Sequence, residues 1–323
     1  MLASATPRPA AASIVLRCPA CSEPAGSLAD LPPQGRGCAA CGFRFEAADG
    51  IVRALAPDRS RLYARFLEEY GAIRSAEGRG SEDPEFYLAL PYRDLTGRNA
   101  GQWAMRARSY RYFERRILPG VETGQPLDIL DLGAGNGWMS YRLALHGHRP
   151  VAIDISADPR DGLGAARHYL ERTPVRFARV LAELERLPFA GGQFDLAIFN
   201  SSFHYATSYH RTLRETQRCL KDSGRVVIMD TPIYRRFEHG ERMREERHRD
   251  FEARYGFRSD SIPSIEFLHD AMLDELADYL FLSWRVYRPW YGLSWHLRPA
   301  RARLFRRRPP SRFAILVGSF RGP

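Results

Sequence analysis

Short apolar runs and longer helical segments alternate along the second half of the chain. The helical segments are clearest at YRLALHGH (141–148) and YHRTLRETQRCL (209–220). Nearly continuous apolar strands joined by helical crossovers are typical of a parallel sheet covered on both faces. The pattern therefore predicts an α/β fold, with strands at LDILDL (127–132), VAIDI (151–155), VRFARV (175–180), FDLAIFN (194–200) and RVVIMD (225–230).

Two more apolar runs occur near the end of the chain, FLSWRVYR (281–288) and RFAILVGSF (312–320). The connection between them is long but contains no convincing helical pattern, so a parallel crossover is disfavoured. We expect these runs to form an antiparallel pair at one edge of the sheet.

The segment before the first strand has a different organisation. SRLYARFLEEYGAI (60–73) and residues 102–118 have helical spacing, whereas residues 74–100 are polar and rich in turns, as in an ordered loop or lid. The residues expected on the apolar faces of the two helices are Leu62, Phe66, Tyr70 and Ile73, then Trp103, Tyr110, Phe113 and Ile117. The predicted units are a disordered tail (1–13), a cysteine-containing module (14–53), a helical lid (54–120) and an α/β domain (121–323).

Composition and charge limit the possible locations and binding partners of the protein only slightly. No apolar run is long enough to span a membrane, and the N-terminus lacks the apolar core of a secretory signal, so a cytoplasmic protein is expected. The net charge of +10 favours anionic partners such as nucleic acid or a membrane surface. The basic residues, however, are scattered and all but Lys221 are arginine, a bias typical of a GC-rich genome.

Four of the five cysteines form two pairs near the N-terminus. Cys18 and Cys21 are separated from Cys38 and Cys41 by sixteen residues, which is the C-x2-C…C-x2-C spacing of a zinc ribbon. Two disulfides are the alternative, but a reducing cytosol disfavours them. Four thiolates would close the coordination shell, so the predicted zinc is structural.

A glycine-rich turn follows the first strand, with Gly133, Gly135 and Gly137 at every second position. The spacing differs from the G-x-G-x-x-G fingerprint that holds a pyrophosphate. Asp131 precedes the turn, where a carboxylate would repel a phosphate but suits a cationic amino group. Asp154 ends the second strand, where it can bind both hydroxyls of a ribose. A ligand with a ribose and a positive end, such as S-adenosylmethionine, fits this arrangement.

These motifs resemble those of class I S-adenosylmethionine-dependent methyltransferases of the type 11/25 kind, over roughly residues 105–320. ELERLPFAGGQFD (183–195) resembles the stretch in which an acidic residue binds the adenine amino group, and Glu183 occupies that position although aspartate is more usual. LKDSGRVVIMD (220–230) resembles the segment that leads into the fifth strand. The resemblance implies a Rossmann-like, seven-stranded, mostly parallel sheet with an antiparallel last strand, beside the small zinc ribbon.

The resemblance also implies that the methyl acceptor lies at the end of the fourth strand. The sequence there is Asn200-Ser-Ser-Phe-His204-Tyr205, with Asn200 next to the cofactor. It lacks the N-P-P-[YF] motif used to hold planar nitrogens, which argues against bases and amides as acceptors. His204 is the best candidate for a general base and Tyr205 the second polar group, although methyl transfer also proceeds by alignment alone. The alternative is that His204 packs against the cofactor or caps the following helix.

Three functional hypotheses follow. The first is methyl transfer to a small-molecule, sugar or lipid-linked acceptor. The second is methylation of ribosomal RNA, held by the ribbon and by the basic aromatic segment 288–312, which could instead contact a membrane or simply pack at the sheet edge. The third is a non-catalytic binding protein, which the intact Asp131, glycines and Asp154 disfavour. The first is preferred.

Overall fold

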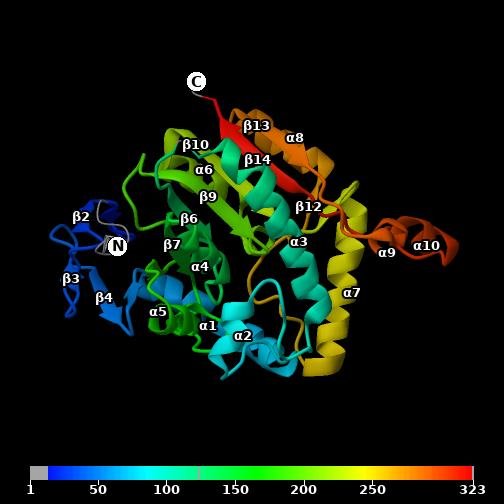
Figure 1. Cartoon of the computed structure of the whole chain (residues 1–323), viewed down its shortest axis with the longest axis horizontal. Coiled ribbons are helices and arrows are strands. Elements are labelled where there is room, and N and C mark those ends of the chain that lie inside the picture. Colours follow the sequence, from blue (N-terminus) through cyan, green and yellow to red (C-terminus); the bar gives the residue numbers. More distant parts are fainter. Residues whose placement is uncertain (1–13, 123, 322–323) are drawn as a thin grey trace, which may run out of the picture.

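The computed structural model describes residues 14–122 and 124–321, so the predicted disordered tail lies outside the described residues. A twisted central sheet runs through the molecule between two layers of helices (Figure 1). The strands are β1 (Val15–Arg17), β2 (Pro24–Ser27), β3 (Arg36–Gly37), β4 (Arg44–Ala48), β5 (Ile51–Arg53), β6 (Asp128–Leu132), β7 (Arg149–Asp154), β8 (Ala178–Leu181), β9 (Phe194–Asn200), β10 (Leu220–Met229), β11 (Ile233–Tyr234), β12 (Leu268–His269), β13 (Leu282–Tyr287) and β14 (Ile315–Phe320).

Ten helices and three short 3-10 turns connect these strands within the described residues. The helices are α1 (Pro57–Ala76), α2 (Pro84–Ala89), α3 (Ala100–Arg116), α4 (Trp138–Leu145), α5 (Arg167–Arg172), α6 (Tyr209–Cys219), α7 (Phe237–Tyr255), α8 (Asp270–Tyr279), α9 (Leu293–His296) and α10 (Arg298–Leu304).

Seven strands of the central sheet have the predicted topology. Their order is β13-β14-β10-β9-β6-β7-β8, and β14 is antiparallel to both of its neighbours while the other pairings are parallel. The α/β fold with a late antiparallel strand pair is therefore confirmed. The five predicted parallel strands and the two crossover helices α4 and α6 also occur where they were expected.

The N-terminal segment extends this sheet. β5 pairs in parallel with β8, β4 pairs antiparallel with β5, and β3 pairs with β4. β1 and β2 form a separate hairpin, and Leu16 bridges to Phe189 in the loop before β9. The cysteine-containing module is thus attached to the α/β domain through backbone hydrogen bonds as well as through side chains.

Each face of the sheet has its own apolar core because successive strand residues point to opposite sides. On one face Leu130, Val151 and Phe199 pack with Leu213 of α6 and Leu276 of α8. On the other, the strand residues pack against α3, α4 and α5, through side chains that include Tyr110, Phe113, Trp138, Leu143 and Tyr169. The sheet is therefore covered on both faces, as continuous apolar strands require.

The helical lid contains two differences from the sequence prediction. The predicted apolar face of α1 is correct at Phe66 and Ile73, but Leu62 is 47% exposed and Tyr63 is buried in its place. The turn-rich segment after α1 contains the short helix α2. The four residues predicted to form the apolar face of the second helix, now α3, are all buried.

The connection between the two late strands also differs from expectation. It contains α9 and α10, which project from the body of the molecule beside α7 (Figure 1). Neither helix has a buried residue. A helix that buries no side chain has only a weak apolar periodicity, which explains why the sequence pattern did not reveal these two.

Candidate functional site

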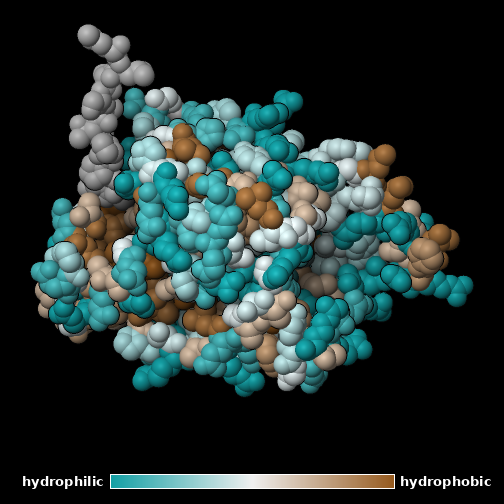
Figure 2. All heavy atoms as spheres, turned by 60° about the horizontal axis from the view of Figure 1, so that its bottom comes forward, coloured by the Kyte–Doolittle hydropathy of each residue, from teal (hydrophilic) through white to brown (hydrophobic). Residues whose placement is uncertain are grey.

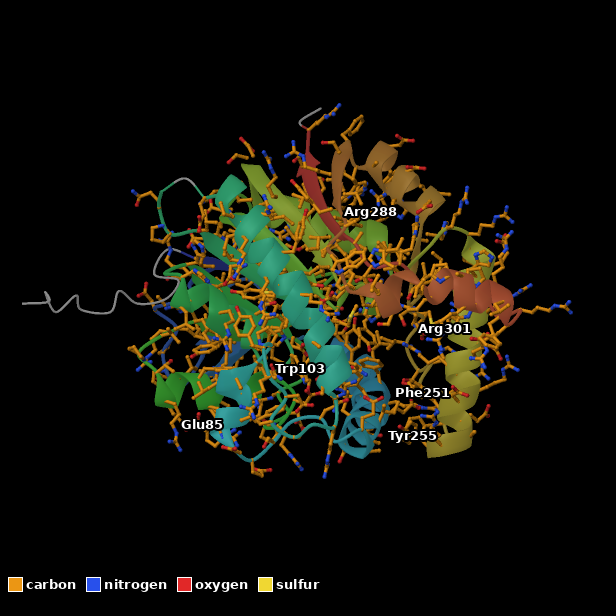
Figure 3. All side chains as sticks on the ribbon, turned by 45° about the vertical axis from the view of Figure 1, so that its right-hand side comes forward. Glu85, Trp103, Phe251, Tyr255, Arg288 and Arg301 are labelled. Atoms are coloured by element: carbon orange, nitrogen blue, oxygen red, sulfur yellow. The ribbon has the colours of Figure 1, made fainter. Side chains whose placement is uncertain are left out.

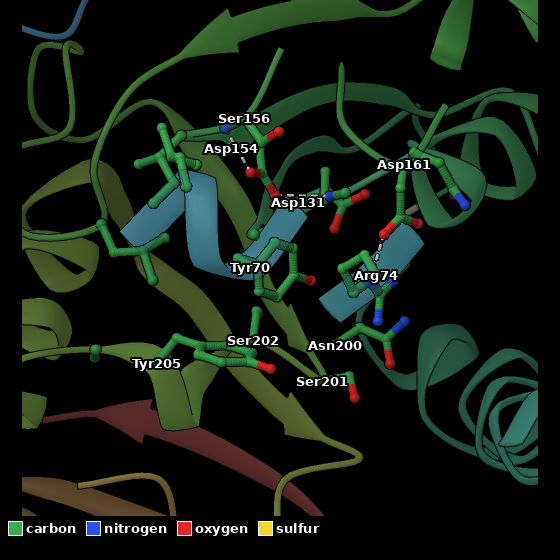
Figure 4. Close-up of a pocket in the computed structure, with 18 of the residues that line it drawn as sticks. Tyr70, Arg74, Asp131, Asp154, Ser156, Asp161, Asn200, Ser201, Ser202 and Tyr205 are labelled. Carbon is green, nitrogen blue, oxygen red and sulfur yellow. Dashed lines mark hydrogen bonds and ion pairs between the residues drawn. The ribbon is translucent and has the colours of Figure 1, made fainter. Parts of the chain in front are cut away.

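A cleft opens at the carboxyl ends of β6, β7 and β9, under the helical lid (Figure 4). Ligands of open α/β sheets bind at this edge. The sheet contributes the loops that follow each strand, and α1 and α3 contribute side chains from above. Five of the seven predicted cofactor-binding residues line the cleft: Asp131, Gly133, Gly135, Asp154 and Asn200. Gly137 and Glu183 do not.

The glycine loop adopts a backbone that only glycine tolerates easily. Gly133, Gly135 and Gly137 have φ angles of +74°, +53° and +78°. A Cβ atom on Gly133 would lie 2.3 Å from the Cβ of Ser202, so that position also needs the missing side chain. Gly137 does not line the cleft but caps α4, and it is the third glycine of the turn that ends at this helix.

Two carboxylates flank the loop, of which Asp131 is buried and Asp154 is partly buried. The carboxylate of Asp131 accepts hydrogen bonds from the backbone N–H and the hydroxyl of Ser140, at 3.0 and 2.7 Å. Burial nevertheless raises the pKa of Asp131 to about 7. A group with this pKa gains from a neighbouring cation, because a positive charge favours its ionised form. The site thus suits an ammonium group.

Asp154 is held by the loop itself. One carboxylate oxygen accepts the N–H of Gly135 at 2.8 Å and the other accepts the N–H of Ser156 at 2.9 Å. Burial raises its pKa, and the two backbone hydrogen bonds oppose that effect. A carboxylate offers about four acceptor positions. Both oxygens therefore keep capacity for the hydroxyls of a ligand.

Aromatic side chains close the cleft on the side of α1. Phe66 stacks with Tyr70 at a centroid distance of 5.5 Å, and both make edge contacts with Tyr205. Tyr205, one of the two predicted catalytic residues, therefore lines the cleft and packs against the lid (Figure 4). The cluster excludes water from this side of the cleft.

Two arginines of the lid reach the same cleft, and the sequence analysis assigned neither of them. Arg74 forms an ion pair with Asp161, in the loop after β7. The guanidinium of Arg106 lies 4.7 Å over the ring of Trp103. Burial and the charges of Arg74 and Arg79 lower the pKa of Arg106 to about 10. A partly buried cation whose charge is disfavoured by its surroundings suits an anionic group on a ligand.

The end of β9 has the predicted polar residues, but in two different environments. Asn200 lines the cleft, and its buried Oδ1 has no hydrogen-bond partner among the described residues. His204 is buried behind Tyr205 and is not among the residues that line the cleft. Burial and the charges of Arg247 and Arg106 lower the pKa of His204 to about 3. The imidazole is therefore neutral and only weakly basic.

Glu183 has its carboxylate turned away from the cleft. Arg59 of α1 donates to both of its oxygens, at 2.6 to 2.9 Å, and the Tyr63 hydroxyl donates to one of them at 3.0 Å. Its neighbours Ala182, Leu184 and Glu185 line the cleft instead. The acidic position of the family motif is thus used here to attach the lid, which its spacing alone did not indicate.

A second polar cluster lies below α3, at the end of β10. Ser109 donates a hydrogen bond to one oxygen of Asp230, and the Tyr291 hydroxyl is 2.8 Å from that of Ser109. The other Asp230 oxygen is buried without a partner among the described residues. Burial raises the pKa of Asp230 to about 6. Sequence patterns gave no signal for this cluster, because its members come from three distant segments.

Comparisons with known proteins agree with the resemblance to methyltransferases for the centre of the chain. Residues 130–228 match a family model described as a methyltransferase domain. This central part of the chain is thus similar to a methyltransferase domain. The matched range runs from β6 to the end of β10, and it contains both flanking aspartates and the glycine loop.

Curated relatives of this methyltransferase domain have several acceptors in their names. A malonyl-[acyl-carrier protein] O-methyltransferase of Geobacter sulfurreducens is 35% identical over 153 residues, 47% of this chain and 50% of that protein. A demethylmenaquinone methyltransferase of Mycobacterium marinum is 31% identical over 125 residues, 38% of this chain and 50% of that protein. The chain thus spans about half the length of the curated relatives it matches.

Solved structures resemble the chain over a larger share. A 1,6-didemethyltoxoflavin-N1-methyltransferase of Burkholderia thailandensis, with bound 1,6-didemethyltoxoflavin and S-adenosylhomocysteine, has 16% identity and a TM-score of 0.47. The match covers 81% of this chain and 91% of that one.

The four paired cysteines meet beside the methyltransferase domain. Their sulfur atoms all lie within 4.8 Å of one another, and the Cys18–Cys41 and Cys21–Cys38 sulfur distances are both 3.6 Å. None of the four forms a disulfide. Tetrahedral zinc with bonds of about 2.3 Å separates its sulfur ligands by about 3.8 Å. The four thiols therefore fit one zinc ion.

No helix among the described residues has both the length and the apolar composition needed to cross a bilayer.

Proposed function

We propose that the protein transfers a methyl group from S-adenosylmethionine to a small-molecule acceptor. The observation that carries the proposal is the pair of carboxylates, buried Asp131 and partly buried Asp154, on either side of a glycine loop inside a region that matches a methyltransferase domain. An ammonium group and a ribose both suit these side chains, and a phosphate suits neither.

The residues of the cleft fit the whole donor. Asp131 would take the amino group, Asp154 the ribose hydroxyls, and Ile155 with Ala182 and Leu184 the adenine ring. Arg106 is the partly buried cation suited to the carboxylate, and Asn200 offers an unpartnered acceptor nearby. Glu183 is not needed as an adenine ligand in this arrangement, because Arg59 and Tyr63 already occupy its carboxylate.

The chemistry depends on alignment. When bound, S-adenosylmethionine supplies a sulfonium methyl group with a neutral leaving group. The lid aromatics and Tyr205 would exclude water and orient the acceptor. A general-base role for His204 is weakened by its pKa of about 3, since a base of this strength removes few protons near neutrality. We therefore assign His204 to the support of Tyr205.

Two observations favour a small acceptor. The cleft lies under α1 and α3, so a substrate must fit between the lid and the ends of the strands. The names of the two relatives contain a malonyl group on an acyl-carrier protein and demethylmenaquinone, and both acceptor groups are small. A lipid-linked or sugar acceptor fits the same description.

We also propose that Cys18, Cys21, Cys38 and Cys41 hold one structural zinc ion. Four thiolates leave no open coordination position, so the ion would have no role in the methyl transfer itself. Its role would be to hold together the β1–β2 hairpin and the β3–β4 turn, which have few apolar side chains of their own.

Calorimetry of the purified chain with S-adenosylhomocysteine tests the donor site. We expect micromolar binding that Asp154→Ala loses, because the variant lacks both acceptor oxygens for the ribose. A matched control is Asp195→Ala, at a carboxylate on the opposite end of the sheet that pairs with Lys221. Equal affinity in all three proteins, or no binding to the unmodified chain, would contradict the proposal.

A further inference from the structure

The arm formed by residues 288–312, which contains α9 and α10, exposes large apolar side chains. Five of them have exposed fractions between 54% and 76%, namely Trp290, Leu293, Leu297, Leu304 and Phe305. Figure 2 shows brown and teal side chains together at the right-hand end of the molecule, where Figure 1 has this arm. Apolar residues gathered on a projecting segment mark an interaction surface.

Arginines accompany these apolar residues. Arg301, Arg303, Arg306 and Arg307 are exposed and form no ion pair with any described residue, and Figure 3 shows Arg301 on α10. Their neighbours Arg308 and Arg312 do form ion pairs, with Glu246 and Asp270. The arm is thus fixed to the body through two arginines while the others remain available.

The available arginines face a groove beside α7. Arg303, Arg306 and Arg307 line it together with Arg235 and Arg236. A groove lined by so many guanidinium groups repels a second copy of the same surface, and it suits phosphate-bearing anions. The occupant must therefore be anionic and must also accept exposed leucine and phenylalanine side chains.

We propose that the arm binds the surface of an anionic lipid bilayer. The apolar side chains would enter the interface, and the arginines would hold lipid phosphates. The alternative of RNA fits less well because one ring face of Trp290 and one of Trp295 are already covered. Trp290 stacks on His296 at 4.0 Å, and Arg298 lies 3.7 Å over Trp295. Three of the five exposed apolar side chains are leucines, which cannot stack on bases.

The base of the arm reaches the polar cluster at the end of β10, which lies beside the cleft, because the hydroxyl of the cleft residue Ser201 donates to the Asp230 carbonyl. Tyr291 is buried, its hydroxyl lies against Ser109, and Ser109 donates to Asp230 at the end of β10. Only one residue separates Tyr291 from the exposed Leu293. Arm binding would therefore bring the lower end of the cleft close to the lipid headgroups. An acceptor drawn from that membrane is a consequence that rests on the proposed function, whereas the binding itself does not.

Vesicle flotation with the full chain tests the proposal. We expect the protein to float with vesicles of phosphatidylcholine and phosphatidylglycerol, much less with phosphatidylcholine alone, and progressively less as salt is raised. Two variants should each reduce the bound fraction about tenfold. One replaces the apolar side chains by serine at Leu293, Leu297, Leu304 and Phe305, and the other replaces arginine by glutamine at Arg301, Arg303, Arg306 and Arg307.

Matched controls carry the same numbers of changes on exposed residues elsewhere. They are serine at Leu62, Leu95, Leu145 and Phe281, and glutamine at Arg61, Arg115, Arg116 and Arg172. Flotation equal in the arm variants and controls, no flotation of the unmodified chain, or arm-dependent binding to RNA or an acidic carrier protein instead would each overturn the proposal. Binding of S-adenosylhomocysteine by the same samples reports on the donor site independently.

Discussion

Arg59 of α1 and Glu183 of the loop after β8 form a bidentate ion pair that joins the lid to the sheet. Arg59 donates to both carboxylate oxygens, and the Glu183 side chain is only 3% exposed. The contact spans 124 residues of sequence. The ion pair connects Glu183 to a helix that covers the cleft. Because the Glu183 carboxylate is held in this way, its neighbours in the loop line the cleft instead.

Arg59→Met should destabilise the protein because it leaves a buried carboxylate without its cation. We expect a loss of about 2 kcal/mol, below the range for fully buried pairs since Arg59 is partly exposed. Denaturant unfolding measures the change. Arg65→Met is the matched control on the same helix, because Arg65 is 75% exposed and solvent screening should make its pair with Glu69 contribute much less to stability.

The same pair predicts the role of Glu183 in ligand binding. If its carboxylate stays with Arg59, Glu183→Gln should change the affinity for S-adenosylhomocysteine by less than about tenfold, or 1.4 kcal/mol. Asp154→Asn should reduce it much more. Calorimetry on the two variants compares them directly, and an equal loss in both would show that Glu183 turns into the cleft when the donor binds.

The glycine loop allows a test in which backbone strain is separated from steric clash. Gly133 and Gly147 both have positive φ, +74° and +83°, but a Cβ on Gly133 meets Ser202 whereas one on Gly147 has no neighbour within 4 Å. Gly147→Ala should cost about 1 kcal/mol through strain alone. Gly133→Ala should cost more and should also abolish binding of S-adenosylhomocysteine.

Thermal unfolding and calorimetry on the two alanine variants measure these effects. Retained ligand affinity in Gly133→Ala would mean that the Ser202 contact does not shape the cleft. A similar loss of affinity in Gly147→Ala, far from the ligand, would instead point to a general loosening of the fold.

Sequence reasoning succeeded where a pattern is local. The apolar runs gave the strands because a buried parallel strand needs almost every side chain to be apolar. The glycine turn and its two aspartates lie within 24 residues of one another, and these neighbours in sequence also meet at the same cleft. The paired cysteines are local in the same sense, and their sulfurs meet as the spacing indicated.

Sequence reasoning was less successful where the two residues of a side-chain contact lie far apart in the chain. Nothing near Glu183 indicates Arg59, and nothing near Asp230 indicates Ser109 or Tyr291. Tyr63 replaced Leu62 in the core because the helix orientation is set by what it packs on, which a single amphipathic pattern does not specify. The extension of the sheet by β4 and β5 was missed for the same reason.

The cysteine cluster predicts that each chain binds one metal ion, which a chelator can remove. Elemental analysis should find about one zinc per chain, lost in Cys18→Ser and kept in Cys219→Ser, whose thiol is buried at the end of α6. Chelation should lower the melting temperature because a closed thiolate site contributes directly to folding. Zinc retained by Cys18→Ser, or an unchanged melting temperature after its removal, would contradict a structural site.

Asp131 predicts how stability depends on pH without a ligand. Its pKa in the folded protein is raised to about 7, above its ordinary value in an unfolded chain. The folded state then binds the proton more tightly, so this carboxyl contributes most stability below pH 4, and the contribution is lost as the pH rises to about 7. Asp131→Asn removes the titration, and its stability relative to the unmodified chain should increase over that interval.

Ligand binding should show the opposite dependence on pH. An ammonium group favours the ionised form of Asp131, so affinity for S-adenosylhomocysteine should rise about tenfold from pH 6 to pH 8 and binding should release protons near pH 6. Calorimetry in two buffers of different ionisation enthalpy measures that release. Asp131→Asn should bind more weakly and with no such dependence. An identical pH profile in this variant would assign the titration to Asp154, whose pKa burial also raises, and would move the ammonium group away from Asp131.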